Sequence, residues 1–325
     1  MRLKVTKYLH SRYAMLLAVS LMALAAWSTC FSGDFVRIAG DRGIALPSAN
    51  CWIASADISY CAGLFLCVAI IAMIIFVNRS YNLLRDMSML PIVLFAFMMA
   101  ATPELSAQLY TGSVLCLTVS VCIALMFGSY GRPDRRRRVF MVFFLLSAGT
   151  ATQYSFAAYI PVMLMCCGQM RILSLRTVIA ALLGIVTPWW LMFGFGIVTP
   201  AELHMPEISS LFSKLDPADG LQLGATALVT SIIFIASVAL DFFRTMAYNA
   251  RARSYNGTIV LTGFMTVIAM IADYNNMVSY MIVLNMCAAL QCAQFFIIHR
   301  TERSWIGIAG VLATYASLYL WKIMP

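Results

Sequence analysis

Four consecutive arginines, Arg135-Arg136-Arg137-Arg138, stand between two long apolar stretches of the chain, residues 111–129 and 139–152. Short loops rich in Lys and Arg remain on the cytoplasmic side of a membrane, because moving them across is costly. The run therefore predicts a cytoplasmic loop at this point. It also predicts the direction of every apolar stretch before and after it.

The composition is that of an integral-membrane protein. Hydrophobic residues make up 62% of the 325 residues and charged residues only 11%, with a mean hydropathy of +0.87. Soluble domains carry about 25% charged residues. We therefore expect a single integral-membrane domain over residues 1–325, an all-α polytopic helical bundle. The net charge of +9 lies in short loops between apolar runs, so we expect no nucleic-acid partner.

The apolar runs predict eleven spans, since one span needs about 20 residues. The N-terminus is then inside and the C-terminus is outside. All of the 22 basic residues except four fall inside; the four are Arg37, Arg42, Lys214 and Lys322. The predicted spans are 13–32, 58–78, 88–102, 111–129, 139–152, 155–170, 177–196, 222–242, 258–273, 277–298 and 305–322.

Residues 139–170 are short for two spans and long for one. A single crossing would reverse the side of every later loop and place many more basic residues outside. We therefore expect a hairpin of two helices that turns near residues 149–155.

The two longest outer connections, 33–57 and 197–221, are the places where the sequence leaves room for a surface site. In the first, Asp34 and Asp41 are candidate catalytic carboxylates. Arg37 and Arg42 are candidate phosphate ligands through paired N–H donors. Alternatively, Asp34 and Arg37 pair with each other at the end of the first span.

Glu104 is a third candidate catalytic residue, because Pro103 breaks the chain and leaves a carboxylate at the predicted membrane boundary. An ionisable side chain at that depth indicates function by default. Alternatively, Thr102 caps a short helix and Glu104 complements the dipole of that helix.

In the second long connection, Glu202, His204 and Glu207 are candidate ligands of a divalent metal, the one cofactor for which the sequence leaves room. A surface turn followed by an amphipathic segment is the alternative. Asp241 and Asp273 fall at the ends of predicted spans, which argues against a proton-coupled transporter. Cys51 and Cys61 flank one end of the second span and can form a disulfide in an oxidising compartment.

Several segments on either side of the arginine run carry a resemblance to known families. They are residues 78–85, Leu90-Pro91, 101–104, 145–155 and Pro188-Trp189-Trp190. They resemble a group of multi-pass bacterial inner-membrane proteins with no assigned activity. The order of parts is also similar to that of C-type membrane glycosyltransferases, which use polyprenyl-phosphate sugar donors. These parts are a first span, an acidic first outer loop, a Thr-Pro break and a two-helix hairpin.

The resemblance to the glycosyltransferases implies that Asp34 or Asp41 is the catalytic base and that Glu104 is a second acidic residue of the site. We therefore expect a transferase or polymerase that acts on lipid-linked saccharides at the outer face. Its partners would be membrane lipids and a polyprenyl-phosphate-linked sugar. The alternatives are a non-enzymatic subunit that binds other membrane proteins, and a carrier for a lipid or a small solute.

Overall fold

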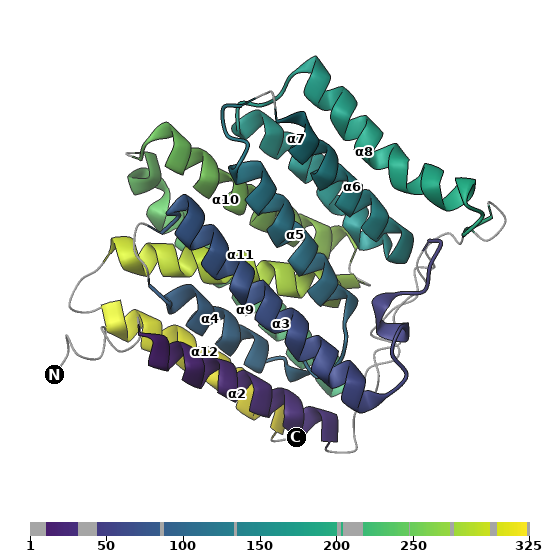
Figure 1. The fold of residues 1–325 in the computed structure, drawn as a ribbon. Helices are drawn as coiled ribbons and strands as arrows, with labels where there is room; N and C mark the ends of the chain where they lie inside the picture. The colour runs from purple at the N-terminus through teal and green to yellow at the C-terminus, as the bar shows by residue number, and fades with distance from the viewer. Residues whose placement is uncertain are drawn as a thin grey trace.

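The structure, a computed structural model, is a bundle of helices (Figure 1). It describes residues 11–31, 44–84, 88–132, 135–199, 203, 217–246, 248–273, 276–299 and 304–323. In these residues there are eleven α-helices and no strand, so the all-α prediction is confirmed. Seven of the helices, α2, α3 and α8 to α12, are long and apolar enough to cross a membrane.

The helices follow the predicted spans one for one. They are α2 (Arg12–Phe31), α3 (Ala56–Tyr81), α4 (Leu90–Ala100), α5 (Thr111–Phe127), α6 (Arg136–Thr152), α7 (Tyr159–Gln169), α8 (Leu175–Gly194), α9 (Pro217–Met246), α10 (Ala250–Ala272), α11 (Met277–Ile298) and α12 (Ser304–Ile323). Three short 3-10 helices lie between them: η1 (Ala49–Cys51), η2 (Pro103–Leu105) and η3 (Tyr154–Ala158).

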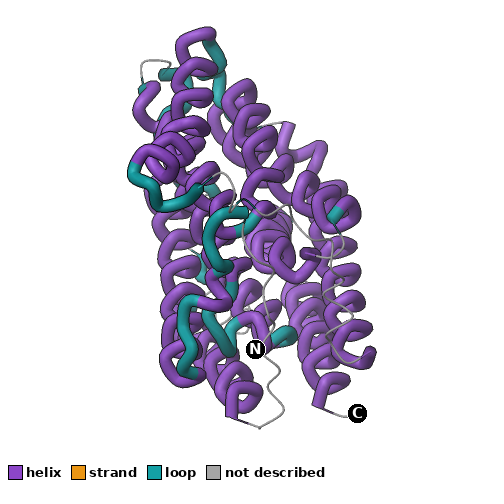
Figure 2. The backbone as a smooth tube through the Cα atoms, turned by 90° about the vertical axis from the view of Figure 1, so that its right-hand side faces the viewer, coloured by secondary structure: helices purple, strands orange, loops and turns teal. Residues whose placement is uncertain are grey.

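Helix α11 forms the centre of the bundle. Almost all of its residues are buried, and α4, α5, α9 and α10 pack around it. By contrast, the outward faces of the peripheral helices expose large apolar side chains, such as Leu24, Phe65, Leu183 and Trp190. A bundle with an apolar outer surface suits lipid as its solvent and supports the prediction of a multi-pass membrane protein. Figures 1 and 2 show the helices running roughly along one common direction.

Two of the helices, α4 and α7, are much shorter than their neighbours. Each has 11 residues and so rises only about 16 Å, against a hydrocarbon core of about 30 Å. Helix α4 runs into η2 at its C-terminal end, and α7 follows directly after η3. Non-helical backbone at membrane depth is tolerated only where protein or a water-filled cavity surrounds it. The ends of these two helices therefore need polar partners inside the bundle.

The predicted hairpin in residues 139–170 is present as two helices, α6 and α7. The chain leaves α6 at Gln153, whose backbone is extended (φ −160°, ψ 134°), and enters η3. The break falls in the predicted turn.

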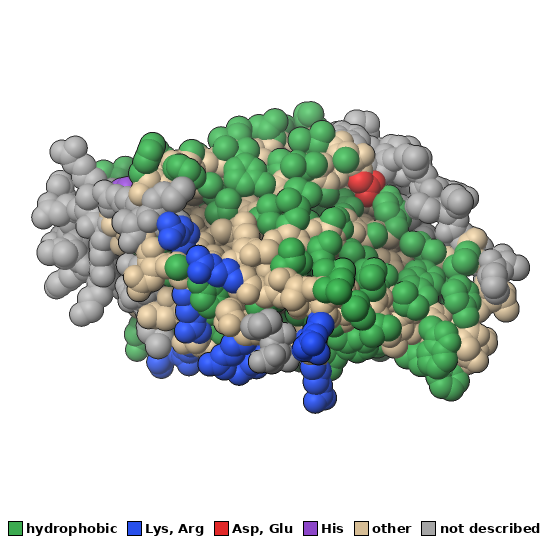
Figure 3. Space-filling view, turned by 90° about the horizontal axis from the view of Figure 1, so that it is seen from above, with side chains coloured by type: hydrophobic (Ala, Val, Ile, Leu, Met, Phe, Trp, Pro, Cys, Tyr) green, Lys and Arg blue, Asp and Glu red, His purple; other side chains and the backbone are tan. Residues whose placement is uncertain are grey.

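Charge separates the two ends of the bundle. Among the described side chains, Lys322 is the one basic group at the end that holds Asp57, Glu104 and Asp273. We call the other end the arginine end; in the view of Figure 3, Lys and Arg gather toward one side, while the Asp or Glu in view lies toward the other. The described basic residues of the arginine end are Arg12, Arg79, Arg132, Arg135, Arg136, Arg137, Arg138, Arg171, Arg176, Arg251 and Arg253.

Candidate functional site

Of the eight residues that the sequence singled out, the structure describes Glu104. The other seven lie outside the described residues: Asp34, Arg37, Asp41, Arg42, Glu202, His204 and Glu207. In the part of the chain that is described, no three His, Cys, Asp or Glu side chains are close enough to hold a metal ion. The candidate site therefore has to be built outward from Glu104.

Glu104 lies in η2, where α4 has ended. Proline lacks an N–H and restricts the residue before it, so Pro103 stops the helix and Thr102 takes a non-helical backbone (φ −130°, ψ 69°). The side chain of Thr102 makes no capping hydrogen bond. Thr102 thus stands at the N-cap position of η2, with Glu104 in the first turn, but it caps this short helix without its hydroxyl.

The chain after η2 is recessed below the end of α3. The Ser59 hydroxyl of α3 accepts a hydrogen bond from the backbone N–H of Leu109 (2.9 Å). Deeper in the same helix, Gly63 faces the carbonyls of Ser106 and Gln108, so closely that a Cβ atom there would collide with the Gln108 carbonyl. Gly63 lies seven residues into α3, which is about 10 Å along the axis. Glu104 and its neighbours thus lie inside the bundle, below its surface.

Lys322, from the last turn of α12, forms an ion pair with Glu104. The ammonium contacts Oε1 of the carboxylate, and the two side chains are only 17% and 14% exposed. The second carboxylate oxygen, Oε2, is buried and has no hydrogen-bond partner among the described residues. One oxygen of the carboxylate is therefore paired with an ammonium group, and the other oxygen lacks a hydrogen-bond donor.

Three more buried polar atoms near Glu104 lack a partner in the described part of the chain: Thr102 Oγ1, Gln108 Nε2 and Gln222 Oε1. Gln222, from α9, is held there because its Nε2 donates to the carbonyls of Ala101 (2.9 Å) and Leu318 (3.4 Å). We call Thr102, Glu104, Gln108, Gln222 and Lys322 the Glu104 cluster. Leaving a buried polar group unpaired costs about 1–3 kcal/mol. Water or a ligand rich in hydroxyl groups would supply the missing donors and acceptors.

A second polar group, the Asp273 network, lies at the same end of the bundle, where α10 ends and α11 begins. Its centre is the Asp273 carboxylate. Tyr154 donates to one oxygen (3.0 Å) and Tyr280 donates to the other (3.1 Å). The Asn276 amide bridges both oxygens, at 3.1 and 3.3 Å. The carboxylate is thus held by three neutral donors, one from η3 and two from the start of α11, where Asn276 is the N-cap residue.

The Asp273 network reaches toward the Glu104 cluster through Ser279. The Ser279 hydroxyl is hydrogen-bonded to Gln153 Nε2 (3.0 Å) and to the hydroxyl of Tyr110 (3.2 Å). Tyr110 belongs to the same connection as Gln108, between η2 and α5. Gln153 is 5% exposed, and its Oε1 has no partner in the described residues. The C-terminal end of α4 and the N-terminal end of α7 thus both lie at polar clusters, at the same end of the bundle.

At the arginine end, two cavities lie on either side of a buried hydrogen bond. Gln294 of α11 donates through Nε2 to Oδ2 of Asp241 in α9 (3.3 Å). Asp241 lines one cavity of about 170 Å³, and Gln294 lines the other, of about 280 Å³. Asp241 is near the end of its predicted span, but it is only 2% exposed, because α9 continues to Met246. The sequence placed Asp241 at the end of a span, and the structure adds that its carboxylate is buried against Gln294.

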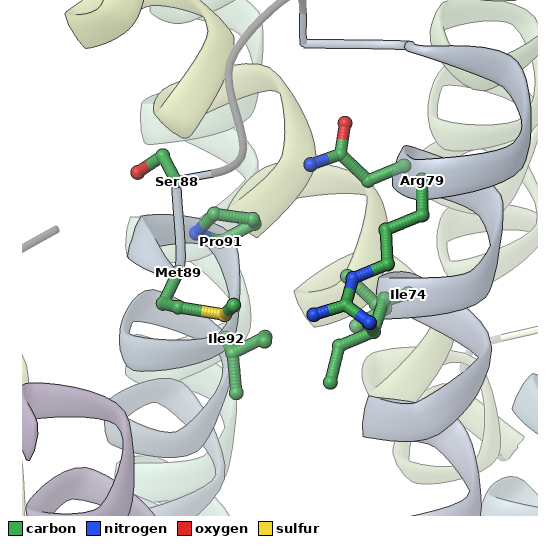
Figure 4. A pocket seen from close by; sticks show the side chains of 8 residues that line it. Ile74, Arg79, Ser88, Met89, Pro91 and Ile92 are labelled. Atoms are coloured by element: carbon green, nitrogen blue, oxygen red, sulfur yellow. The ribbon is translucent and has the colours of Figure 1, made fainter. Parts of the chain in front are cut away.

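A smaller pocket between α3 and α4 is too small for a substrate. Its volume is about 10 Å³, which is room for about one water. In Figure 4 the side chain of Arg79 extends beside Ile74 and faces Met89 and Ile92 across the pocket. Asn78, another of its lining residues, accepts a hydrogen bond from the backbone N–H of Leu84 (3.0 Å). This hydrogen bond holds the turn that follows α3.

The ten cysteines are all free, including Cys51 and Cys61, so the structure contains no disulfide between these two.

No protein-family model, no curated protein and no solved structure matches the chain. The sequence pattern pointed to Glu104 but to none of its partners. One signal for Lys322 was present, because it is among the four basic residues that fall on the predicted outer side. Gln222 and the Asp273 network left no such signal, since isolated polar residues in spans ordinarily make hydrogen bonds between helices.

Proposed function

We propose that the chain crosses a bacterial inner membrane eleven times, with its arginine end in the cytoplasm and the Glu104 cluster near the outer face. The charge separation between the two ends of the bundle supports this orientation, because Lys and Arg are retained on the cytoplasmic side. Helix α4 is too short to cross the hydrocarbon core alone, but it is buried among neighbouring helices. This burial supports a crossing by α4, because protein and not lipid surrounds the non-helical backbone at its end.

We further propose that the protein is a transferase or polymerase acting on lipid-linked saccharides at this outer face. The observation that carries the proposal is the Glu104 carboxylate, which is recessed in the bundle, paired on one oxygen with Lys322 and without a partner on the other. The unpaired atoms of Thr102, Gln108 and Gln222 lack hydrogen-bond partners. The hydroxyl groups of a saccharide both donate and accept hydrogen bonds, so they would supply these partners.

In this proposal Glu104 removes the proton from a hydroxyl group of the acceptor. The acceptor oxygen then bonds to the anomeric carbon of the donor sugar. The bond between that carbon and the phosphate oxygen breaks, and the lipid phosphate leaves with the electron pair. Lys322 stabilises the negative charge on the departing phosphate. When the phosphate draws the ammonium away from Glu104, the carboxylate is released to act as a base.

Asp34 and Asp41 remain candidates for the base, and Arg37 and Arg42 remain candidates for further contacts to the phosphate. They lie just after α2 in the sequence, outside the described residues. Glu104 and these carboxylates therefore have to be compared in one experiment.

The test is complementation of a strain that lacks the protein, with surface glycans profiled and the membrane level of each variant measured. We expect Glu104→Gln to lower glycan formation at least about 100-fold, the loss typical for removal of a general base. Asp57→Asn is the matched control, because Asp57 is an exposed carboxylate at the same end, in the first turn of α3. Asp34→Asn and Asp41→Asn are measured alongside.

Wild-type glycans in Glu104→Gln, Asp34→Asn and Asp41→Asn alike would overturn the enzyme proposal, and would favour a subunit of a membrane complex or a carrier. Loss in Asp34→Asn or Asp41→Asn with normal glycans in Glu104→Gln would move the base to the first outer connection and overturn the role of Glu104.

A further inference from the structure

The C-terminal end of α5, at the arginine end of the bundle, is fully capped by hydrogen bonds. The hydroxyls of Tyr81 in α3 and Tyr255 in α10 each donate to a carbonyl of its last turn, at 2.9 and 3.0 Å. Ser129 satisfies the other two carbonyls of that turn, through its hydroxyl and its backbone N–H. Arg135, the N-cap residue of α6, donates through Nη1 to the carbonyl of Gly128 (3.0 Å). The end of this helix therefore needs no further donor.

A second guanidinium, that of Arg138 in α6, nevertheless lies at the same place. It fills the position that a Cβ atom on Gly128 would take, with the Tyr81 hydroxyl beside it. Arg138 is half-buried, and no hydrogen bond or ion pair engages its guanidinium in the described part of the chain. A guanidinium carries five N–H donors, and a charge that is partly withdrawn from water is costly unless it is paired. Arg138 therefore has donors to offer to a ligand.

Three guanidiniums gather around the Tyr81 hydroxyl. Arg135, Arg138 and Arg251 are all close enough to interact with it electrostatically. Arg251 comes from α10, where it donates to the hydroxyl of Tyr255 (2.7 Å). Within the described residues, none of the three arginines forms an ion pair with a carboxylate. Like charges held together repel one another, and a bound anion would remove this repulsion.

Aromatic side chains place these arginines at the depth of lipid headgroups. The rings of Tyr81 and Tyr130 pack edge-on against the ring of Tyr255, with centroids 5.7 and 5.8 Å away. Tyrosine is enriched at both membrane–water interfaces, where its ring lies at the headgroup level. Phe76, five residues earlier in α3 and so deeper in the bundle, packs edge-on against Tyr81 and is 50% exposed. An exposed apolar side chain beneath the arginines offers a surface to an acyl chain.

We propose that Arg135, Arg138 and Arg251 bind the phosphate of an anionic phospholipid in the leaflet at the arginine end. The guanidinium of Arg138 contacts the phosphate through paired N–H donors, and an acyl chain lies along Phe76. The headgroup carries no ammonium, as in a phosphatidylglycerol, because three guanidiniums would repel a positive charge. A lipid fits better than a soluble phosphate, which would make no use of the apolar surface at Phe76. The site is separate from the Glu104 cluster and does not depend on its activity.

The experiment is native mass spectrometry of the purified, delipidated full chain in detergent, titrated with two lipids of identical acyl chains. One lipid has a glycerol headgroup and the other has a choline headgroup, so that both carry a phosphate and only the choline lipid carries an ammonium. We expect the glycerol lipid to bind the wild-type chain about tenfold more tightly, because the ammonium of choline meets the three guanidiniums.

Two variants and a matched control locate the site. Arg138→Gln should weaken binding of the glycerol lipid about tenfold, the effect of losing one charge-assisted hydrogen bond. Arg251→Gln should weaken it about threefold, because Arg251 is exposed and its charge is screened by water. Arg137→Gln is the control: it removes the same charge from the neighbouring residue, which is exposed and does not act on the Tyr81 hydroxyl. We expect Arg137→Gln to change the affinity by less than about twofold.

Equal binding of the two lipids to the wild-type chain would overturn the proposal. Equal losses in Arg137→Gln and Arg138→Gln would also overturn it, since only the overall charge of this end would then count. If Arg138→Gln fails to fold, the comparison of Arg251→Gln with Arg137→Gln decides in the same way. Soluble glycerophosphoglycerol is titrated as a competitor. If it displaces the glycerol lipid at equal concentration, the phosphate alone is recognised and the lipid assignment is wrong.

Discussion

At the scale of single residues, the Glu104–Lys322 pair is the contact whose loss should matter most for stability. Replacing Lys322 by Met leaves a buried carboxylate without its counter-charge, which typically costs about 3–5 kcal/mol. We expect Lys322→Met to lower the free energy of unfolding by about this amount. The double variant Glu104→Gln/Lys322→Met should regain much of the loss, since no buried charge is then left alone. Denaturant unfolding of the purified variants in detergent checks both values. Equal stability of Lys322→Met and the wild type would show that the pair is solvated.

Glu104 itself could be predicted from the sequence, because Pro103 ends a helix one residue before a carboxylate at a predicted membrane boundary. Lys322 as its partner could not, since the two residues come from opposite parts of the chain and meet only through the packing of α12 beside α4. The burial of Asp241 could not be predicted either, for a related reason. Hydropathy ends the span at residue 242, whereas α9 continues to Met246 and places the carboxylate against Gln294.

At the scale of elements, α8 depends on one close helix crossing. It packs mainly on α6, where Gly184 lies so near the backbone of Phe140 that an added Cβ would collide with the carbonyl oxygen. The Ser147 hydroxyl donates to the carbonyl of Ile185 at the same crossing (2.6 Å). Small residues let helices in a membrane approach this closely. We therefore expect Gly184→Leu to destabilise the protein by about 1–3 kcal/mol through overpacking.

The matched control for this crossing is Gly194→Leu in the same helix, because no atom lies within 4 Å of the place where its Cβ would be. Thermal unfolding in detergent should distinguish the two variants. If both unfold at the wild-type temperature, α8 is not held by the crossing at Gly184.

The positions of the helices could be predicted from hydropathy, because each apolar run has to satisfy its backbone within itself. The lengths of α4 and α7 could not. Predicted as residues 88–102 and 155–170, they are shorter helices joined to 3-10 segments. Their outer ends are held by side chains from other helices, such as Gln222 and Ser279, which no periodicity within the segment reveals.

At the scale of the whole molecule, the separation of charge predicts which loops are cytoplasmic. A reporter phosphatase that is active only outside the cytoplasm should be inactive when fused after residue 133 or Met170, at the arginine end. It should be active when fused after Gln153 or after residue 325. Activity after Gln153 tests whether α6 and α7 each cross, because a stretch that stays on the cytoplasmic side would leave that fusion inactive. For the arginine test, the reporter is inserted after residue 133 with the rest of the chain following it. Replacing Arg135 to Arg138 by Gln should then raise its activity, since these arginines hold that loop inside. Activity after residue 133 in the unaltered chain would reverse the orientation, and would move the Glu104 cluster to the cytoplasmic face, where an outer-face transferase cannot work.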